Sequence, residues 1–155
     1  MTSPRPMSLP YGALPPPYGP PITLADARQV MAAAEAEAAV HGWPMVIAIV
    51  GSGGQLVMLH ALDQAQHGSV PIAQAKAETA VSFRRPSKLF EDAVAAGSLG
   101  LRLLGMPNLM PLDGGLPLLV DGRVVGAIGV SGMQSVQDAQ VAAAGAAALA
   151  AAGIP

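Results

Sequence analysis

Histidine and lysine side chains are the groups in this sequence best able to hold a metal ion, an anion or a moving proton. Of the three histidines, His60 and His67 lie at the end of a predicted strand and in the loop after it, where binding and catalytic residues are common. Either could be a metal ligand or a proton shuttle, and either could be an ordinary polar loop residue. His41 precedes Gly42 at a predicted helix end, where capping and the helix dipole explain it.

Lys76 is one of only two lysines and falls in the middle of a predicted helix, with Thr79 three residues further on. An amine there could hold a carboxylate through charge-assisted hydrogen bonds, or act as a base, and the Thr79 hydroxyl could reach the same ligand. The alternatives are a surface lysine that covers apolar groups with its stem, and a helix threonine bonded to its own backbone. The residues alone leave both interpretations open.

The pair Gly114-Gly115 is a further candidate, because successive glycines allow positive φ angles and let backbone N–H groups face an anion. A tight entry into the next strand would explain the pair equally well. Asp63 could orient a ligand or cap a loop. Asp138 fits best as the last member of a capping box with Ser135.

The elements that must position these residues follow an α-β-β-α-α-β-β-α order. Strands joined by hairpins predict an antiparallel sheet of four to five strands flanked by helices, which is an α+β fold in a single domain. The Asp121-Gly122 pair is a strong hairpin signal. Ser69, Ser87 and Ser135 are predicted helix caps. The expected helices span residues 24–40, 70–83, 87–96 and the C-terminal alanine-rich run; the expected strands span 45–50, 55–60, 115–120 and 123–131, with a possible fifth near 109–112.

Composition narrows the classes of partner. Of 155 residues, 52% are hydrophobic and only 12% are charged, so we expect apolar surface to be buried between subunits of a homo-oligomer. A net charge of −2 without a basic stripe disfavours nucleic acid, and no stretch is long enough to span a membrane. The absence of cysteine excludes disulfides and thiolate chemistry.

Residues 1–21 are rich in proline and are predicted to be an N-terminal arm, with the domain proper at 22–155. The arm could be a mobile leader, or it could pack on a neighbouring subunit through Tyr11 and Tyr18. It lacks the continuous apolar run of a secretory signal, so the expected location is cytoplasmic.

Several segments together resemble the GlcG/HbpS-like family, whose members include haem-binding proteins and the C-terminal domain of PduO proteins. They are Gly114-Gly115-Leu116-Pro117, Val124 to Gly132, Gln137-Asp138, Leu62-Asp63-x-Ala65 and Ile72-Ala73-x-x-Lys76-Ala77-x-Thr79-Ala80. The resemblance implies a profilin-like sheet flanked by helices and assembly into oligomers. It implies haem or a related small molecule as ligand. Neither His60 nor His67 falls on a motif of the family, and either could be the iron ligand because an imidazole nitrogen binds haem iron. The implied ligand-binding residues are Lys76, Thr79, Asp63, Gly114 and Gly115.

The leading hypothesis is therefore a small oligomeric ligand-binding protein with a pocket near the Lys76 helix and the Gly114-Gly115 loop. The alternative is an enzyme acting on a small organic acid or carbonyl compound, with Lys76 as anion holder or base and His60 or His67 as proton shuttle. Gly51 and Ala61 stand where the family usually has an aspartate and an arginine. This loss of charge leaves open a specialised branch of the family that binds a different, more apolar ligand.

Overall fold

Strand β1 (Val46–Gly51) lies at the centre of the fold, and all of its residues are buried. In the computed structural model, which describes residues 14–152, it pairs antiparallel with β2 (Leu56–Ala61) and with β4 (Arg123–Ser131), and β4 pairs with β3 (Gly115–Val120). The strand order is β2-β1-β4-β3. The predicted antiparallel α+β domain is confirmed with four strands, and residues 109–112 form no strand.

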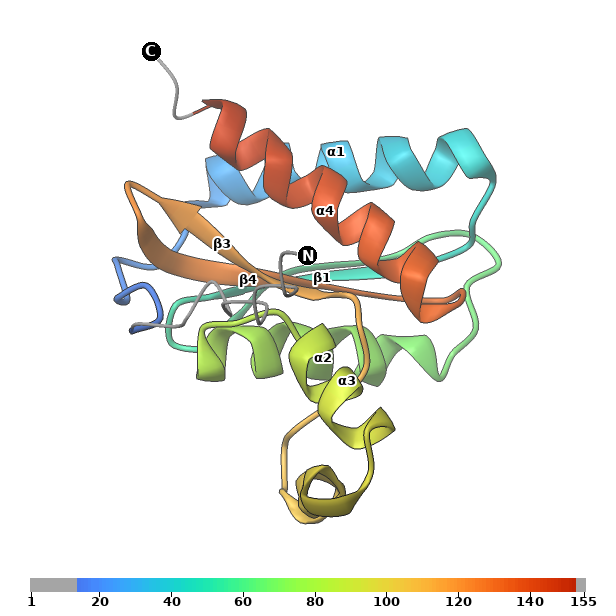
Figure 1. Cartoon of the computed structure of the whole chain (residues 1–155). Helices are drawn as coiled ribbons and strands as arrows, with labels where there is room; N and C mark the ends of the chain where they lie inside the picture. Colours follow the sequence, from blue (N-terminus) through green and yellow to red (C-terminus); the bar gives the residue numbers. More distant parts are fainter. Residues whose placement is uncertain (1–13, 153–155) are drawn as a thin grey trace, which may run out of the picture.

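Helices cover both faces of this sheet (Figure 1). Helices α1 (Leu24–His41) and α4 (Ser135–Ala152) lie against one face, and α2 (Ser69–Phe83) lies against the other. After α2 come the short helix α3 (Lys88–Ala95) and the 3₁₀ helix η1 (Ser98–Gly105), which stand away from the sheet. The result is a three-layer arrangement with a hydrophobic layer on each side of the sheet.

The two hydrophobic layers follow from the alternation of side chains along β1. Ile47 and Ile49 join the cluster under α1 and α4, whereas Val46, Ala48 and Val50 join clusters under α2. The helices contribute mainly alanines to these layers, and small side chains let a helix approach the sheet closely. At Gly129 a Cβ atom would lie 2.0 Å from the Ala73 carbonyl oxygen of α2, so helix packing explains this strand glycine.

The predicted end of the first helix and the predicted hairpin turn are both correct. Gly42 ends α1 in the left-handed conformation, and the Thr23 side chain accepts a hydrogen bond from the Asp26 N–H. Asp121 and Gly122 both have positive φ, as a type I′ hairpin turn requires. A structure of this hairpin could thus be predicted from two residues.

The serine caps were predicted wrongly. Ser69 and Ser135 are the first residues of their helices instead of the residues before them. Ser87 does precede α3, but its hydroxyl donates to the Leu112 carbonyl oxygen (2.6 Å) and caps nothing. These serines hold distant segments together, which local propensity does not reveal.

The last part of the proline-rich arm packs on its own chain. The Tyr18 hydroxyl donates to the Val81 carbonyl oxygen at 2.6 Å, and the Arg84 guanidinium lies 5.0 Å from the centre of the Tyr18 ring. Tyr18 therefore anchors residues 14–21 to the end of α2 in cis, and Tyr11 lies outside the described residues. None of the helices within residues 14–152 is both long and apolar enough to cross a membrane.

Candidate functional site

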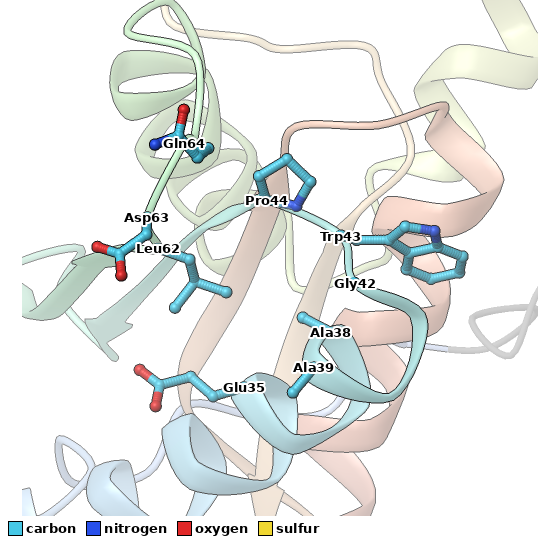
Figure 2. A pocket seen from close by; sticks show the side chains of 9 residues that line it. All are labelled: Glu35, Ala38, Ala39, Gly42, Trp43, Pro44, Leu62, Asp63 and Gln64. Carbon is cyan, nitrogen blue, oxygen red and sulfur yellow. The ribbon is translucent and has the colours of Figure 1, made fainter.

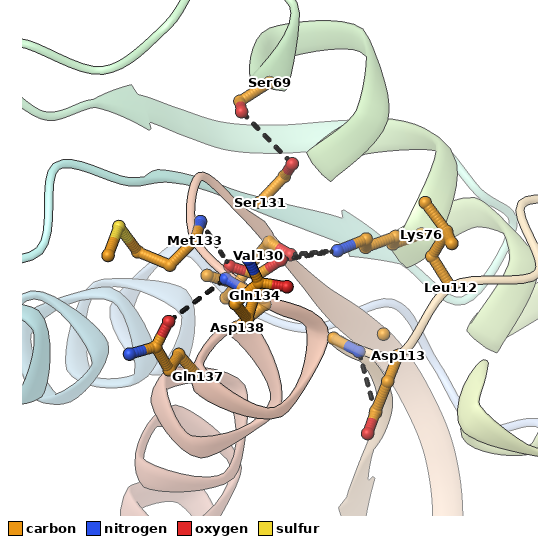
Figure 3. Close-up of polar contacts among 12 residues, drawn as sticks. Ser69, Lys76, Leu112, Asp113, Val130, Ser131, Met133, Gln134, Gln137 and Asp138 are labelled. Atoms are coloured by element: carbon orange, nitrogen blue, oxygen red, sulfur yellow. Dashed lines mark hydrogen bonds and ion pairs between the residues drawn. The ribbon is translucent and has the colours of Figure 1, made fainter. Parts of the chain in front are cut away.

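Lys76 forms a buried ion pair with Asp138. The Lys76 Nζ donates to Asp138 Oδ2 and to the Val130 carbonyl oxygen, each at 2.9 Å, and the two side chains are only 2% and 4% exposed. Figure 3 shows the lysine reaching from α2 past the end of β4 to the first turn of α4. Lys76 is therefore not a surface lysine, and its ammonium already has protein partners.

Asp138 is not part of the predicted capping box with Ser135. Its Oδ1 accepts a hydrogen bond from the Met133 N–H at 3.0 Å, one residue before the position that caps α4. Gln137 takes the capping role instead, since its side-chain oxygen accepts from the Gln134 N–H at 3.1 Å. Asp138 thus ties the chain entering α4 to Lys76 of α2.

The double glycine packs directly on this pair. A Cβ atom at Gly114, whose φ is +121°, would lie 3.1 Å from the Lys76 Nζ and 2.6 Å from the Val130 carbonyl oxygen. A Cβ atom at Gly115 would lie 2.3 Å from the Lys76 carbonyl oxygen. Both glycines are buried, so close approach to the protein itself explains why no side chain is present there.

Burial dominates the electrostatics of the two carboxyl groups near Lys76. It raises the pKa of the Asp138 carboxyl, and the hydrogen bonds from Lys76 and Met133 offset part of that rise. Burial likewise raises the pKa of Asp113, although the Gly114 N–H donates to its Oδ1 at 2.8 Å. The cluster is a desolvated charge network in which each ionised group depends on its neighbour.

Thr79 lies on the α2 side of the cluster, and its hydroxyl bonds to another segment of the chain. It is fully buried, and its Oγ1 accepts a hydrogen bond from the Met110 N–H at 2.9 Å. The expected bond to its own helix backbone is not the contact that the hydroxyl makes. Thr79 instead fastens the segment that leads from η1 to β3.

A separate, open hollow of about 430 Å³ lies between the end of α1 and the loop after β2 (Figure 2). It has mostly apolar walls with two carboxylates, Glu35 and Asp63, on the same side of Leu62. Of the predicted ligand-binding residues, only Asp63 lines it. The lining residues are Glu35, Ala38, Ala39, Gly42, Trp43, Pro44, Leu62, Asp63 and Gln64.

The three histidines differ sharply in their surroundings. His60 Nδ1 makes a short contact with the Glu35 carboxylate, which places this exposed imidazole at the margin of the hollow. His41 bonds through Nε2 to Glu37 at 3.0 Å and stacks on Trp43, with ring centroids 4.1 Å apart. His67 is exposed in the loop before α2. His60 and His41 each have a carboxylate on one ring nitrogen and adjoin residues of the hollow, but the His41 ring is stacked on Trp43.

Sequence reasoning missed Glu35 and Trp43. Glu35 stands two residues before Glu37 in an alanine-rich helix and contacts a histidine 25 residues later, so only the packing of α1 against β2 distinguishes it. Trp43 could have been noticed as the sole tryptophan of the chain. Across residues 14–152 no group of three or more histidine, aspartate or glutamate side chains is placed to hold a metal ion.

Comparison with known proteins agrees with the family resemblance found in the sequence. Residues 22–147 match a family model described as haem degrading protein HbpS-like. Protein GlcG of Escherichia coli strain K12 is 41% identical over 105 residues, which cover 68% of this chain and 77% of GlcG.

Two solved structures share the fold and have sequence identities of 32% and 28% with this chain. A double mutant of Streptomyces reticuli HbpS superposes with a TM-score of 0.77 and 32% identity, covering 84% of this chain and 88% of that one. A structure described as a PduOC:heme complex superposes with a TM-score of 0.75 and 28% identity, covering 83% of this chain and 94% of that one.

Proposed function

Because this chain belongs to the HbpS-like family, we propose that it is a small binding protein for haem or a closely related ligand. The observation that carries the proposal is the likeness, over 83% of the chain, to a PduOC structure described as a complex with haem. The HbpS likeness supports the same class of ligand. A shared fold does not by itself establish a shared ligand, so the residues of this chain must also fit haem.

The proposed iron ligand is His60. A haem iron is commonly held by one imidazole nitrogen while the other ring nitrogen is bonded to a carboxylate or carbonyl, which orients the ring and makes it a stronger ligand. The contact between His60 Nδ1 and Glu35 provides this second partner and leaves Nε2 for the iron. His41 has Nε2 bonded to Glu37, and His67 has no such carboxylate among the contacts of the described residues.

The hollow beside His60 suits the face of a porphyrin better than its propionates. Its apolar walls are formed by Leu62, Pro44 and the alanines of α1. No lysine or arginine occurs among the nine lining residues, and Glu35 and Asp63 would repel an anion. We therefore expect haem to bind with its propionates toward solvent, and a less anionic macrocycle to bind more tightly.

This placement moves the proposed pocket away from the Lys76 helix. The Lys76 ammonium is bonded to Asp138 and Val130, and releasing it to a ligand would leave a buried carboxylate unpaired. Lys76, Thr79, Gly114 and Gly115 are thus proposed to shape the fold around β4 and α4. Asp63 remains the predicted ligand-binding residue closest to the proposed site.

A haemin titration tests the proposal. Purified protein is titrated while the Soret band and the fluorescence of Trp43, the only tryptophan, are recorded. We expect a saturable Soret shift at one haemin per chain with quenching of Trp43. His60→Ala should remove the shifted band, and Glu35→Gln should weaken binding about 10- to 100-fold.

His67→Ala is the matched control, because it removes an exposed histidine from the next loop and should bind as the wild type does. A band that survives in His60→Ala but disappears in His67→Ala would make His67 the iron ligand. Unsaturable uptake by every variant would overturn haem binding itself.

We also propose that the protein works as a homo-oligomer in the cytoplasm. The sparse charge of the sequence supports self-association, since 12% charged residues cover the surface of a single chain poorly. The cytoplasmic location is supported only by the sequence, in which residues 1–21 lack the continuous apolar run of a secretory signal. Cell fractionation tests it.

A further inference from the structure

The segment from Lys88 to Leu112 forms a lobe that has no core of its own. It contains α3 and η1, lies below α2 in Figure 1, and touches α2 through Phe90, which packs on Phe83, and through the Met110 N–H, which donates to Thr79. Not one of its residues is buried in the single chain. Helices of eight residues are too short to be stable without packing against other elements. In the single chain, α3 and η1 have little of the burial that normally stabilises such short helices.

Apolar side chains on the lobe are instead exposed to solvent. In a 3₁₀ helix residues three apart lie on the same side, which places Leu101 and Leu104 on one face of η1 and Leu99 beside Arg102 on the next. Leu99, Leu101 and Leu104 are 75%, 50% and 64% exposed. The third face, with Gly100 and Leu103, lies toward α3.

The lobe also carries a recess next to these leucines. A hollow of about 450 Å³ lies between α3 and η1, lined by Ala93, Ala96, Gly97, Ser98, Leu99, Gly100, Arg102 and Leu103. Exposed leucines beside a recess with apolar walls make the surface complementary to itself. Two copies related by a two-fold axis could each insert a leucine into the recess of the other.

The charges of the lobe have the same self-complementary character. Lys88 is paired with Asp92 at 2.9 Å within α3. Glu91 and Arg102 form no ion pair with any residue of the described chain, 14–152. Across a two-fold axis, Glu91 of each copy could pair with Arg102 of the other, which gives two ion pairs. The lobe has no net charge, so it has no electrostatic attraction for an anionic membrane or for nucleic acid.

We propose that this lobe, residues 88–112, is the surface through which two copies of the chain associate. The inference rests on the self-association proposed above and not on haem binding. It names the contact: leucines of η1 in the partner's recess, with Glu91 of each copy facing Arg102 of the other. Burial of the leucines in the dimer supplies the packing that α3 and η1 lack in a single chain.

Sedimentation equilibrium tests the contact. The wild type should have a mass of at least twice the 15.5 kDa of one chain. Leu101→Lys with Leu104→Lys should raise the dissociation constant about 100-fold or more, because two buried apolar side chains become charged. Val136→Lys is the matched control, since Val136 is 72% exposed on α4, a helix on the opposite face of the sheet from α2 and the lobe, and should leave the mass unchanged.

Charge reversal gives the sharper test, because neither Glu91 nor Arg102 is buried and the doubly changed protein controls for each single change. Arg102→Glu alone and Glu91→Arg alone should each weaken association about fivefold, and the two together should restore it. A monomeric wild type would refute self-association. An oligomer that keeps its mass in the leucine variant, or charge changes that do not compensate, would refute this surface while self-association stands.

Discussion

Replacing Asp138 by alanine is expected to be the most damaging single change to the stability of this fold. The Lys76 ammonium would remain in a site that is 2% exposed, with the Val130 carbonyl oxygen as its one remaining partner. Leaving such a charge unpaired costs about 3–5 kcal/mol. The Met133 N–H would also lose its acceptor, which adds about 1–3 kcal/mol.

We therefore expect Asp138→Ala to lower the free energy of unfolding by roughly 4–8 kcal/mol, a large part of the total for a domain of this size. Asp138→Asn separates the two contributions, because its side-chain oxygen can still accept from Met133 while the negative charge is gone. Its loss should be smaller than that of alanine by about the cost of the orphaned N–H.

Lys76→Met provides the reverse perturbation. It leaves the Asp138 carboxylate unpaired, and burial already raises the pKa of that group. A folded-state pKa above the unfolded value means that the folded protein takes up a proton as the pH falls. The decrease in the free energy of unfolding caused by Lys76→Met should thus be greatest at neutral pH and smaller in acid.

Urea unfolding followed by circular dichroism measures these effects. With a slope of about 2 kcal/mol per molar urea, Asp138→Ala should lower the midpoint by about 2–4 M. A loss below about 1 kcal/mol would mean that water reaches Lys76 in the folded protein. The description of this pair as a desolvated network would then be wrong.

Two further outcomes follow from residues near the pair. Asp113→Asn should raise the melting temperature at pH 7, because burial raises the pKa of the Asp113 carboxyl and the ionised form therefore destabilises the folded protein. In calorimetric scans the gain in melting temperature should vanish as the pH falls toward 3.8. A gain that does not depend on pH would contradict this cause. Thr79→Val should lower the free energy of unfolding by about 1–3 kcal/mol in urea, since the Met110 N–H loses its acceptor; an unchanged midpoint would show that water replaces the hydroxyl.

The sequence predicted well the features that depend on neighbouring residues. The Asp121-Gly122 turn and the Gly42 helix end are decided by which φ angles a few residues tolerate, and both were correct. The sheet followed from two such hairpins. The family resemblance then agreed with the matched model over residues 22–147.

The candidate site was harder because its contacts join distant segments. Lys76 and Asp138 are 62 residues apart, and Asp138 stood in a pattern that imitates a capping box. Nothing local distinguishes a buried, paired lysine from a surface lysine in an alanine-rich helix. Glu35 was missed for the same reason, since its role depends on β2 lying beside α1.

The strand order has a consequence for how the chain folds as it is synthesised. Strand β1 can pair early with β2, but its other edge pairs with β4, about 80 residues later in the chain. At a synthesis rate of about 5–20 residues per second, that edge would wait roughly 4–16 s for its partner. During this interval an apolar strand, Val46–Gly51, exposes unpaired backbone groups that can recruit another nascent chain. Folding yield in the cell should thus depend on translation speed between residues 51 and 123 and on chaperones that shield this one edge.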